Sequence, residues 1–485
     1  MSTDSPTFLK GSFRDRNGRI FLKDGEVHRA LSARALEEWQ ALSQTRFFPR
    51  LVGEGKIVAT EQVSAGGTLP PEELQAWSAV LWHERVPVVT YPYEWCFGML
   101  KDAALLQVEL LLAALDEDTI LKDSSAFNFQ WRGTSPVFID VLSFERYLEG
   151  EPWVGYRQFC QFFLNPLMLQ AYKDVAFHDW LRGNIDGIEP GRLNQLFSLR
   201  DRLRRGVLPH VYLHAKLQKS FGSTQTDIGK AMKSGGFQKE MVRQNVKRVG
   251  RLIERLEWKA ARSEWSEYVE DNSYSGPDLE IKQEFVREVI AEKYRGTVWD
   301  CGCNTGQFSR LAAVNSDTVL ALDSDHLSIE RLYQTLKQTD NRTILPLVYD
   351  ISQPSPGLGW AGSERLPLTE RSSPDLVLCL ALIHHVVISA NIPLEEFVGW
   401  LESLDTEVVI EYVSKQDPMV EKLLLNKRDD YSDYEQEFFE NCLARRFQVV
   451  RKVDLPSGTR ALYYARPMSR GSGQASGSAV ADSAS

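Results

Sequence analysis

Short apolar runs alternate with helical patterns over residues 291–467 of the chain. Apolar runs of strand length, each followed by a segment of helical periodicity, predict parallel strands joined by crossover helices. The last two runs flank a Pro-Ser-Gly turn and predict an antiparallel hairpin. The expected strands are 297–299, 318–322, 344–349, 375–380, 407–410, 447–453 and 461–465. The pattern therefore predicts an α/β, Rossmann-like domain with a doubly wound, seven-stranded sheet.

The pattern before this domain is different. Residues 1–220 contain short strand signals near 19–22 and 56–61 and an amphipathic helical stretch over 100–115, which predicts an α+β domain. Residues 230–264 are charged and helical in pattern, and we expect them to pack against the C-terminal α/β domain as a connector. Residues 469–485 are rich in Ser, Gly and Ala, which predicts a disordered tail.

The length of 485 residues exceeds what one hydrophobic core usually supports, so several domains are expected. The predicted organisation is an α+β domain over 1–220, a helical connector over 221–290, the α/β domain over 291–467 and a tail over 468–485.

Charge and cysteine usage narrow the functional classes. The net charge of -10 disfavours a general binder of nucleic acid or of anionic membranes, because either partner would be repelled. Six cysteines without disulfide or zinc spacing indicate a reducing compartment. The N-terminus is polar and no apolar run is long enough to cross a bilayer, so no membrane span and a cytoplasmic location are expected.

A glycine-containing turn directly follows the first predicted strand of the α/β domain. Its pattern is Asp300-x-Gly302-x-Asn304-x-Gly306. Glycine lets the backbone approach a nucleotide closely and tolerates positive φ. Asn304 stands where such turns usually have their middle glycine, and asparagine is the other residue that adopts the left-handed region readily. The turn therefore predicts a nucleotide site, although a dinucleotide-binding domain could carry a similar one.

Acidic residues end the next two predicted strands as well. Asp323 ends the second strand and is placed to accept hydrogen bonds from ribose hydroxyls. Asp350 ends the third strand. Three acidic residues ending three successive strands favour one nucleoside-containing ligand over three unrelated loop aspartates.

This region resembles the nodulation-protein-type class I S-adenosylmethionine-dependent methyltransferases. The resemblance covers about 265–466 and depends on three motifs: Trp299–Ser309, the segment from Asp350 through Pro354-Ser355-Pro356 to Gly359-Trp360, and Leu380–His385. It implies S-adenosylmethionine as cofactor, with Asp350 near the adenine amine. It does not identify the methyl acceptor, so a small molecule, a glycan and a protein all stay open.

Candidate catalytic residues lie at the ends of the fourth and fifth predicted strands. His384 and His385 follow the fourth strand, and a histidine there can act as a base near neutral pH. Glu411 ends the fifth strand and is the next residue that could line the pocket. We also expect Trp360 to pack. Upstream candidates for a lid over the cofactor are Tyr268, Asn272, Tyr274 and Lys282.

The N-terminal region contains a second motif, in which Asp123 is followed five residues later by Asn128 and then by a strand ending at Asp140. This resembles the catalytic and metal-binding loops of kinase-like phosphotransferases. The resemblance implies that Asp123 orients a hydroxyl while Asn128 and Asp140 hold Mg²⁺ on ATP. No glycine-rich phosphate loop is visible. No Lys in an apolar strand pairs clearly with a helix Glu, as in these kinases, and Arg29 with Glu37 or Glu38 would replace that pair only poorly. A degenerate kinase-like module is therefore favoured over an active one.

Two functional hypotheses follow. In the first, the protein is an S-adenosylmethionine-dependent methyltransferase whose N-terminal domain recognises the acceptor or regulates activity. In the second, it is bifunctional, or its N-terminal half is a nucleotide-binding regulatory module that takes ATP and Mg²⁺.

Overall fold

The computed structural model describes residues 6–216, 238–259, 276–425, 427 and 431–468. The chain divides into two compact units, one formed by 1–272 with 302–373 and the other by 273–301 with 374–485. The predicted domain boundaries near 220 and 290 stay predictions. The predicted disordered tail, from 469 onward, lies outside the described residues.

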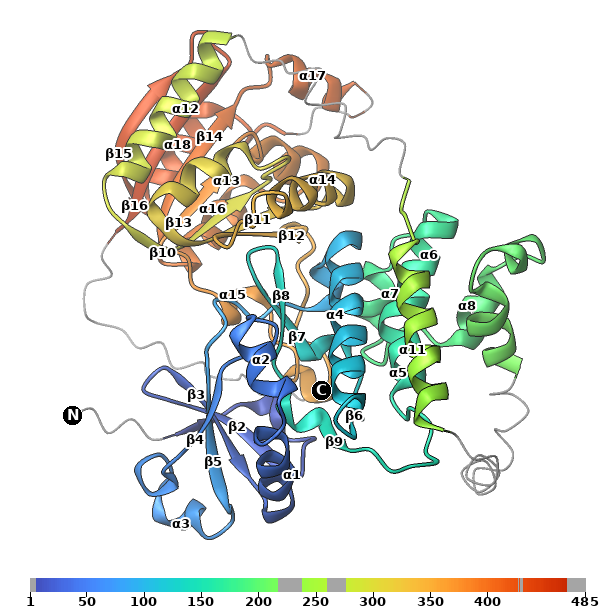
Figure 1. Cartoon of the computed structure of the whole chain (residues 1–485). Helices are drawn as coiled ribbons and strands as arrows, with labels where there is room; N and C mark the ends of the chain where they lie inside the picture. Colours follow the sequence, from blue (N-terminus) through green and yellow to red (C-terminus); the bar gives the residue numbers. More distant parts are fainter. Residues whose placement is uncertain (1–5, 217–237, 260–275, 426, 428–430, 469–485) are drawn as a thin grey trace, which may run out of the picture. The chain divides into compact units, whose positions relative to one another are not determined.

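The first unit begins with an antiparallel sheet (Figure 1). Its third strand leads into α1 (Ala33–Ser43), which is capped by the Ser32 hydroxyl accepting the amide of Ala35. The hairpin between β2 and β3 turns through Asp24 and Gly25, with φ values of 50° and 79°, so it is a tight two-residue turn. In sheet order the strands are β1 (Thr7–Phe8), β2 (Gly18–Lys23), β3 (Glu26–Leu31), β5 (Ala79–His83) and β4 (Thr60–Val63).

Helix α4 (Phe97–Leu115) forms much of the interior of this unit. The stretch was predicted as an amphipathic helix, and the helix is confirmed, but it is buried on most of its circumference, which marks a core helix. Two antiparallel strand pairs follow it, a hairpin and a pair whose strands flank that hairpin in the sequence. They are β6 (Thr119–Leu121) with β9 (Phe144–Arg146) and β7 (Phe129–Arg132) with β8 (Ser135–Phe138).

Helix α11 (Lys239–Glu254) lies alongside α4 (Figure 1). Its apolar face is buried there, and a methyl group added at Gly250 would lie 3.0 Å from Val108 Cγ1 of α4. The prediction that this helix packs against the C-terminal α/β domain is therefore wrong. The periodicity identified the apolar face, but no feature of the helix itself specified which partner would cover it. The remaining helices of the N-terminal part are α2 (Phe47–Gly53), α3 (Pro71–Leu74), α5 (Tyr156–Phe159), α6 (Asn165–Lys173), α7 (His178–Gly183) and α8 (Pro190–Leu196).

The segment 302–373 belongs to the same compact unit and contacts the N-terminal part closely. Tyr333 donates a 2.5 Å hydrogen bond to Asp102, and the Thr134 amide donates to the carbonyl of Asn341 at 3.0 Å. The β7–β8 turn needs glycine, because Gly133 has φ of 59° and a methyl group there would lie 2.2 Å from the Asn341 carbonyl oxygen. Its elements are α13 (Gln307–Ala312), β11 (Ser316–Asp323), α14 (His326–Lys337), β12 (Ile344–Val348) and α15 (Leu368–Arg371).

A mixed sheet of seven strands runs in the order β12-β11-β10-β13-β14-β16-β15. The pairs β11–β12, β10–β13 and β13–β14 are parallel, whereas β16 is antiparallel to both β14 and β15. All seven predicted strands are confirmed, with boundaries shifted by a few residues. The strands not yet given are β10 (Arg295–Cys301), β13 (Leu376–Cys379), β14 (Glu407–Val413), β15 (Phe447–Asp454) and β16 (Arg460–Pro467). This sheet fits a Rossmann-like methyltransferase fold.

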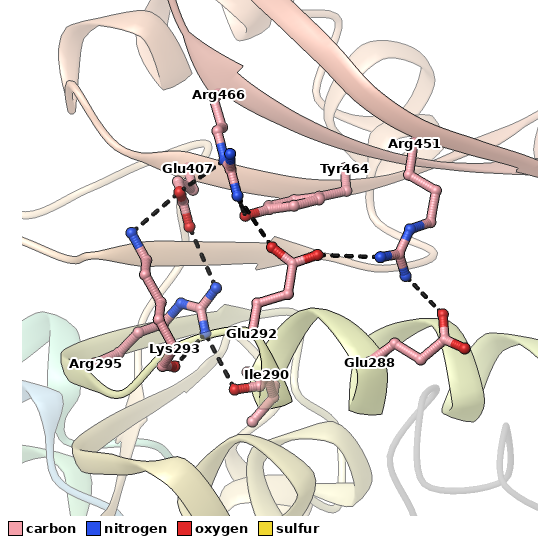
Figure 2. Close-up of polar contacts among 9 residues, drawn as sticks. All are labelled: Glu288, Ile290, Glu292, Lys293, Arg295, Glu407, Arg451, Tyr464 and Arg466. Carbon is pink, nitrogen blue, oxygen red and sulfur yellow. Dashed lines mark hydrogen bonds and ion pairs between the residues drawn. The ribbon is translucent and has the colours of Figure 1, made fainter.

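The second unit contains an ion-pair network at the start of β10 and β14 (Figure 2). Arg295 is only 1% exposed and contacts Glu407 at 3.2 Å, and Glu407 also contacts Lys293 and Arg466. Ligands of α/β sheets bind at the opposite, carboxyl ends of parallel strands, so this network is structural. The helices of this unit are α12 (Gly276–Ala291), α16 (Leu394–Ser403), α17 (Pro418–Leu424) and α18 (Gln436–Ala444).

Within the described parts of the chain, no helix combines the length and apolar character that crossing a bilayer requires. Trp360, which was expected to pack, is 71% exposed on its loop, so that prediction is wrong.

Candidate functional site

The loop from Gly302 to Gly306 turns back sharply after the first strand of the α/β sheet. Gly302, Asn304 and Gly306 all have positive φ, at 75°, 50° and 77°. The prediction that Asn304 adopts the left-handed region is confirmed. A methyl group at Gly306 would lie 2.6 Å from Leu332 Cδ1, so close packing against α14 also requires glycine there. The amides of Gly302 and Cys303 both donate to the Leu322 carbonyl, which ties the loop to β11.

Asp323 ends β11 and faces this loop. One carboxylate oxygen accepts the Asn304 amide at 2.8 Å, and the other accepts the Asp325 amide at 2.9 Å. In the described part of the chain no Lys, Arg or His forms an ion pair with it. Burial raises the pKa of Asp323 to about 6, although the two amides oppose that shift. The carboxylate is thus oriented by backbone donors and keeps lone pairs for further hydroxyl donors.

Asp350 follows β12 and is exposed. Its Oδ1 accepts hydrogen bonds from the amide and the hydroxyl of Ser352, at 2.8 and 2.6 Å, so the carboxylate is held by a local turn. It borders a cavity of about 170 Å³ that Ser324, the residue after Asp323, also lines. Asp350 therefore lines this cavity, and Asp323 is one residue away from its lining.

Asp300 lies in the second unit, near the end of β10, and is buried. Its negative charge is close enough to favour the charged form of Lys282. Its predicted contact with the cofactor stays a prediction.

His384 and His385 come shortly after β13, where the sequence predicts them. Their ring centroids are 4.1 Å apart. His384 is fully buried, and neither ring nitrogen has a hydrogen-bond partner among the described residues. Burial holds the pKa of His384 well below its ordinary value and lowers that of His385 to about 4. Both rings are therefore neutral at physiological pH.

Glu411, the third predicted catalytic residue, is fully buried in β14 and paired with two cations. Lys282 Nζ lies 2.6 Å from Oε2, and Arg460 contacts Oε1 at 3.3 Å. Arg460 also binds Asp417 at 2.6 Å. The charges of Lys282 and Arg460 both contribute to the low pKa of His384. A glutamate already neutralised by two buried cations is a weak proton acceptor.

The sequence did not predict the partners of Glu411. Lys282 was expected in a lid, and that prediction is wrong, because its ammonium is buried against Glu411. Burial lowers the pKa of Lys282, and Glu411 opposes the shift. Lys282 and Arg460 lie 129 and 49 residues from Glu411 in the chain, so no local spacing signals the contact. The other three lid candidates, Tyr268, Asn272 and Tyr274, lie outside the described residues.

The kinase-like motif is brought together in the first unit. Burial and, after it, the charge of Asp140 raise the pKa of Asp123, whereas an Asn128 hydrogen bond opposes the shift. Asp140 pairs with Arg29 at 2.6 Å and accepts the Ser143 hydroxyl. No group of three or more His, Cys, Asp or Glu side chains within the described ranges could hold a metal ion. Binding of ATP and Mg²⁺ is not supported.

The seven-stranded order, with a glycine-rich turn after β10 and an acid ending β11, defines a class I methyltransferase-type fold. The chain belongs to the family of the nodulation protein NoeA. It is 35% identical to NoeA of Rhizobium meliloti (strain 1021) over 461 residues, which cover 94% of this chain and 96% of that protein. No family model matches the chain.

Two solved structures resemble part of the chain. The N-methyltransferase NodS from Bradyrhizobium japonicum WM9, crystallised with S-adenosyl-L-homocysteine, is 13% identical, with a TM-score of 0.30. That match covers 41% of this chain and 97% of NodS. The bifunctional kinase-methyltransferase WbdD is 17% identical, with a TM-score of 0.29, over 41% of each chain.

Proposed function

We propose that the protein transfers a methyl group from S-adenosylmethionine to an acceptor. The observation that carries the proposal is the Asp323 carboxylate, which two backbone amides orient beside a loop of three left-handed residues. A carboxylate without a cationic partner suits the two hydroxyls of a ribose, because it accepts hydrogen bonds without being neutralised. Asp350, at the end of the next strand, is proposed to bind the adenine amine.

When bound, S-adenosylmethionine supplies an electrophilic methyl group on a sulfonium. The chain has to orient the acceptor and exclude water from it. We assign the orienting role to His384 and His385, whose neutral rings can each accept one hydrogen bond and donate another. Glu411 is assigned a positioning role, because Lys282 and Arg460 hold its carboxylate and lie close enough to influence His384.

Calorimetry with S-adenosylhomocysteine tests this proposal. The wild-type chain should bind, and Asp323→Ala should weaken binding by roughly 10- to 150-fold, the loss expected for hydrogen bonds to a charged group. Glu370→Ala, an exposed acid on α15, is the matched control and should bind as the wild type does. No binding by the wild-type chain, or unchanged affinity in a folded Asp323→Ala variant, would refute the proposal.

A second candidate concerns the N-terminal region, which we propose has a kinase-like scaffold. Its support is the sequence of elements: an antiparallel sheet with α1 after β3, the core helix α4, and the paired strands β6–β9 and β7–β8. Between and after these strands lie Asp123, Asn128 and Asp140, at the positions that the motif requires.

Two features favour acceptor recognition over phosphoryl transfer by this scaffold. The two-residue β2–β3 turn is too short to cover a triphosphate. The carboxylate of Asp140, which would hold Mg²⁺, already forms an ion pair with Arg29. We therefore expect no heat of ATP–Mg²⁺ binding at high protein concentration. Binding that disappears in Asp140→Ala would instead establish the nucleotide-binding alternative.

A further inference from the structure

A cavity of about 170 Å³ lies beside Asp350, and the N-terminal part of the chain forms one of its sides. The whole cavity belongs to the first compact unit. Its main lining residues are Tyr93, His178 and Arg182 from the N-terminal part, and His326, Tyr349 and Asp350 from the segment 302–373.

His178 lines this cavity and contains a hydrogen-bond acceptor without a partner among the described residues. Its Nε2 lies 2.8 Å from the Trp95 carbonyl, which can only accept, so Nε2 carries the proton and Nδ1 carries a lone pair. The side chain is only 6% exposed, and Nδ1 has no hydrogen-bond partner among the described residues. Burial also keeps the imidazole neutral, because it holds the pKa of His178 well below the ordinary value.

His326, which also lines the cavity, packs against this ring. Its ring meets that of His178 edge to face, with centroids 4.1 Å apart, and its buried Nδ1 also has no partner in the described part of the chain. A buried acceptor left without a donor costs free energy, so His178 Nδ1 favours a ligand that supplies an N–H group. The carboxylate of Asp350 on the same cavity adds acceptor capacity.

Close contacts hold the two sides of the cavity together. Glu94, which lines it, forms a buried ion pair with Arg371 and accepts the Tyr91 amide at 2.8 Å. The Gly98 amide donates to Glu330 of α14 at 2.7 Å. The two segments that line the cavity are therefore joined by direct contacts of their own side chains and backbone.

We infer that this cavity receives the adenine edge of the cofactor and that His178 Nδ1 accepts a hydrogen bond from the exocyclic amine. The inference rests on the proposed methyltransferase function. The amine has two N–H groups, so Asp350 and His178 can accept one each. The N-terminal part thereby completes the cofactor site and makes it selective for a 6-amino purine over a 6-oxo purine, which offers an acceptor at that position.

The test compares S-adenosylhomocysteine with S-inosylhomocysteine, its 6-oxo analogue, by calorimetry on the full chain. The wild-type chain should prefer the amino compound. His178→Ala should weaken its binding by about three- to tenfold, as expected for one hydrogen bond, and leave the 6-oxo analogue unaffected. His178→Gln, which can offer a carbonyl acceptor, should restore part of the preference.

His214→Ala is the matched control, because His214 also has a buried Nδ1 without a partner among the described residues but does not line the cavity. It should leave both affinities unchanged. Equal affinities of the wild type and His178→Ala for S-adenosylhomocysteine, or equal losses for both ligands, would overturn the inference. If Asp323→Ala still loses binding in that case, the proposed function stands; if the wild type binds neither ligand, the proposed function itself fails.

Discussion

Asp140 and Asp323 both lie at the end of a strand in the first unit, but their surroundings differ. Asp140, after β8, pairs with the Arg29 guanidinium and accepts the Ser143 hydroxyl, and these partners keep its pKa below the ordinary value despite burial. Asp323, at the end of β11, accepts hydrogen bonds from backbone amides and has no cationic partner among the described residues, and burial raises its pKa to about 6. The protein itself satisfies Asp140, whereas Asp323 remains available to a ligand.

The comparison shows how to separate a structural acid from a binding acid at a strand end. Position alone does not distinguish them, because both sites looked alike in the sequence. The deciding difference is the presence of a cation supplied by the chain. Glu411 in the second unit belongs with Asp140, since two cations already bind it.

The largest expected effect concerns Glu411. Glu411→Gln leaves Lys282 without its close anionic partner in a fully buried site, and breaking such a pair costs about 3–5 kcal/mol of unfolding free energy. Urea denaturation followed by tryptophan fluorescence measures the loss. The double variant Glu411→Gln with Lys282→Met should recover part of it, because it removes the unpaired cation. An unchanged midpoint in the single variant would contradict the structural assignment of Glu411.

A smaller loss of stability is expected for Asp140. Asp140→Ala leaves Arg29 buried without an anion, and we expect about 2 kcal/mol, less than for a fully buried pair because the Asp140 side chain is 23% exposed. Because the pKa of Asp140 is depressed, this contribution is present at neutral pH and disappears as pH falls through its folded-state pKa. Denaturation of wild type and variant at several pH values measures the difference. Affinity for S-adenosylhomocysteine should stay unchanged; a large loss would place Asp140 in the binding site.

The smallest effect is a pH dependence of cofactor binding. With its pKa raised to about 6, Asp323 is ionised at pH 7 and mostly protonated at pH 5, where it can accept fewer hydrogen bonds. Affinity for S-adenosylhomocysteine should therefore fall by about tenfold from pH 7 to pH 5, as the loss of one required ionisation predicts. Asp323→Asn should bind weakly with a flat profile. A flat profile in the wild type would show that the Asp323 charge has no role in binding.

The sequence predicted the α/β sheet well because its signals are local. Each strand is a short apolar run. The residue types at Gly302, Asn304 and Gly306 predict the left-handed backbone conformation that these residues adopt. The placement of His384 and His385 after the fourth strand follows from the same strand pattern.

Contacts between distant segments were not predictable. Nothing near His178 indicates that its ring lines a cavity with Asp350, 172 positions later, because the contact depends on how α7 packs. The extent to which α4 is buried and the element that covers α11 were not predicted for a related reason. Periodicity identifies an apolar face, but tertiary packing decides which element covers it.

The contact of Gly133 with Asn341 has a consequence for inheritance. The turn of an N-terminal hairpin lies so close to the loop before β12 that a side chain at position 133 would collide with the backbone of Asn341 and Arg342. A recombination event that replaced only the last third of the gene with a distant relative's would join backbones that had not diverged together. We therefore expect the two regions to be inherited together, with glycine kept at position 133 whichever side chains stand at 341 and 342.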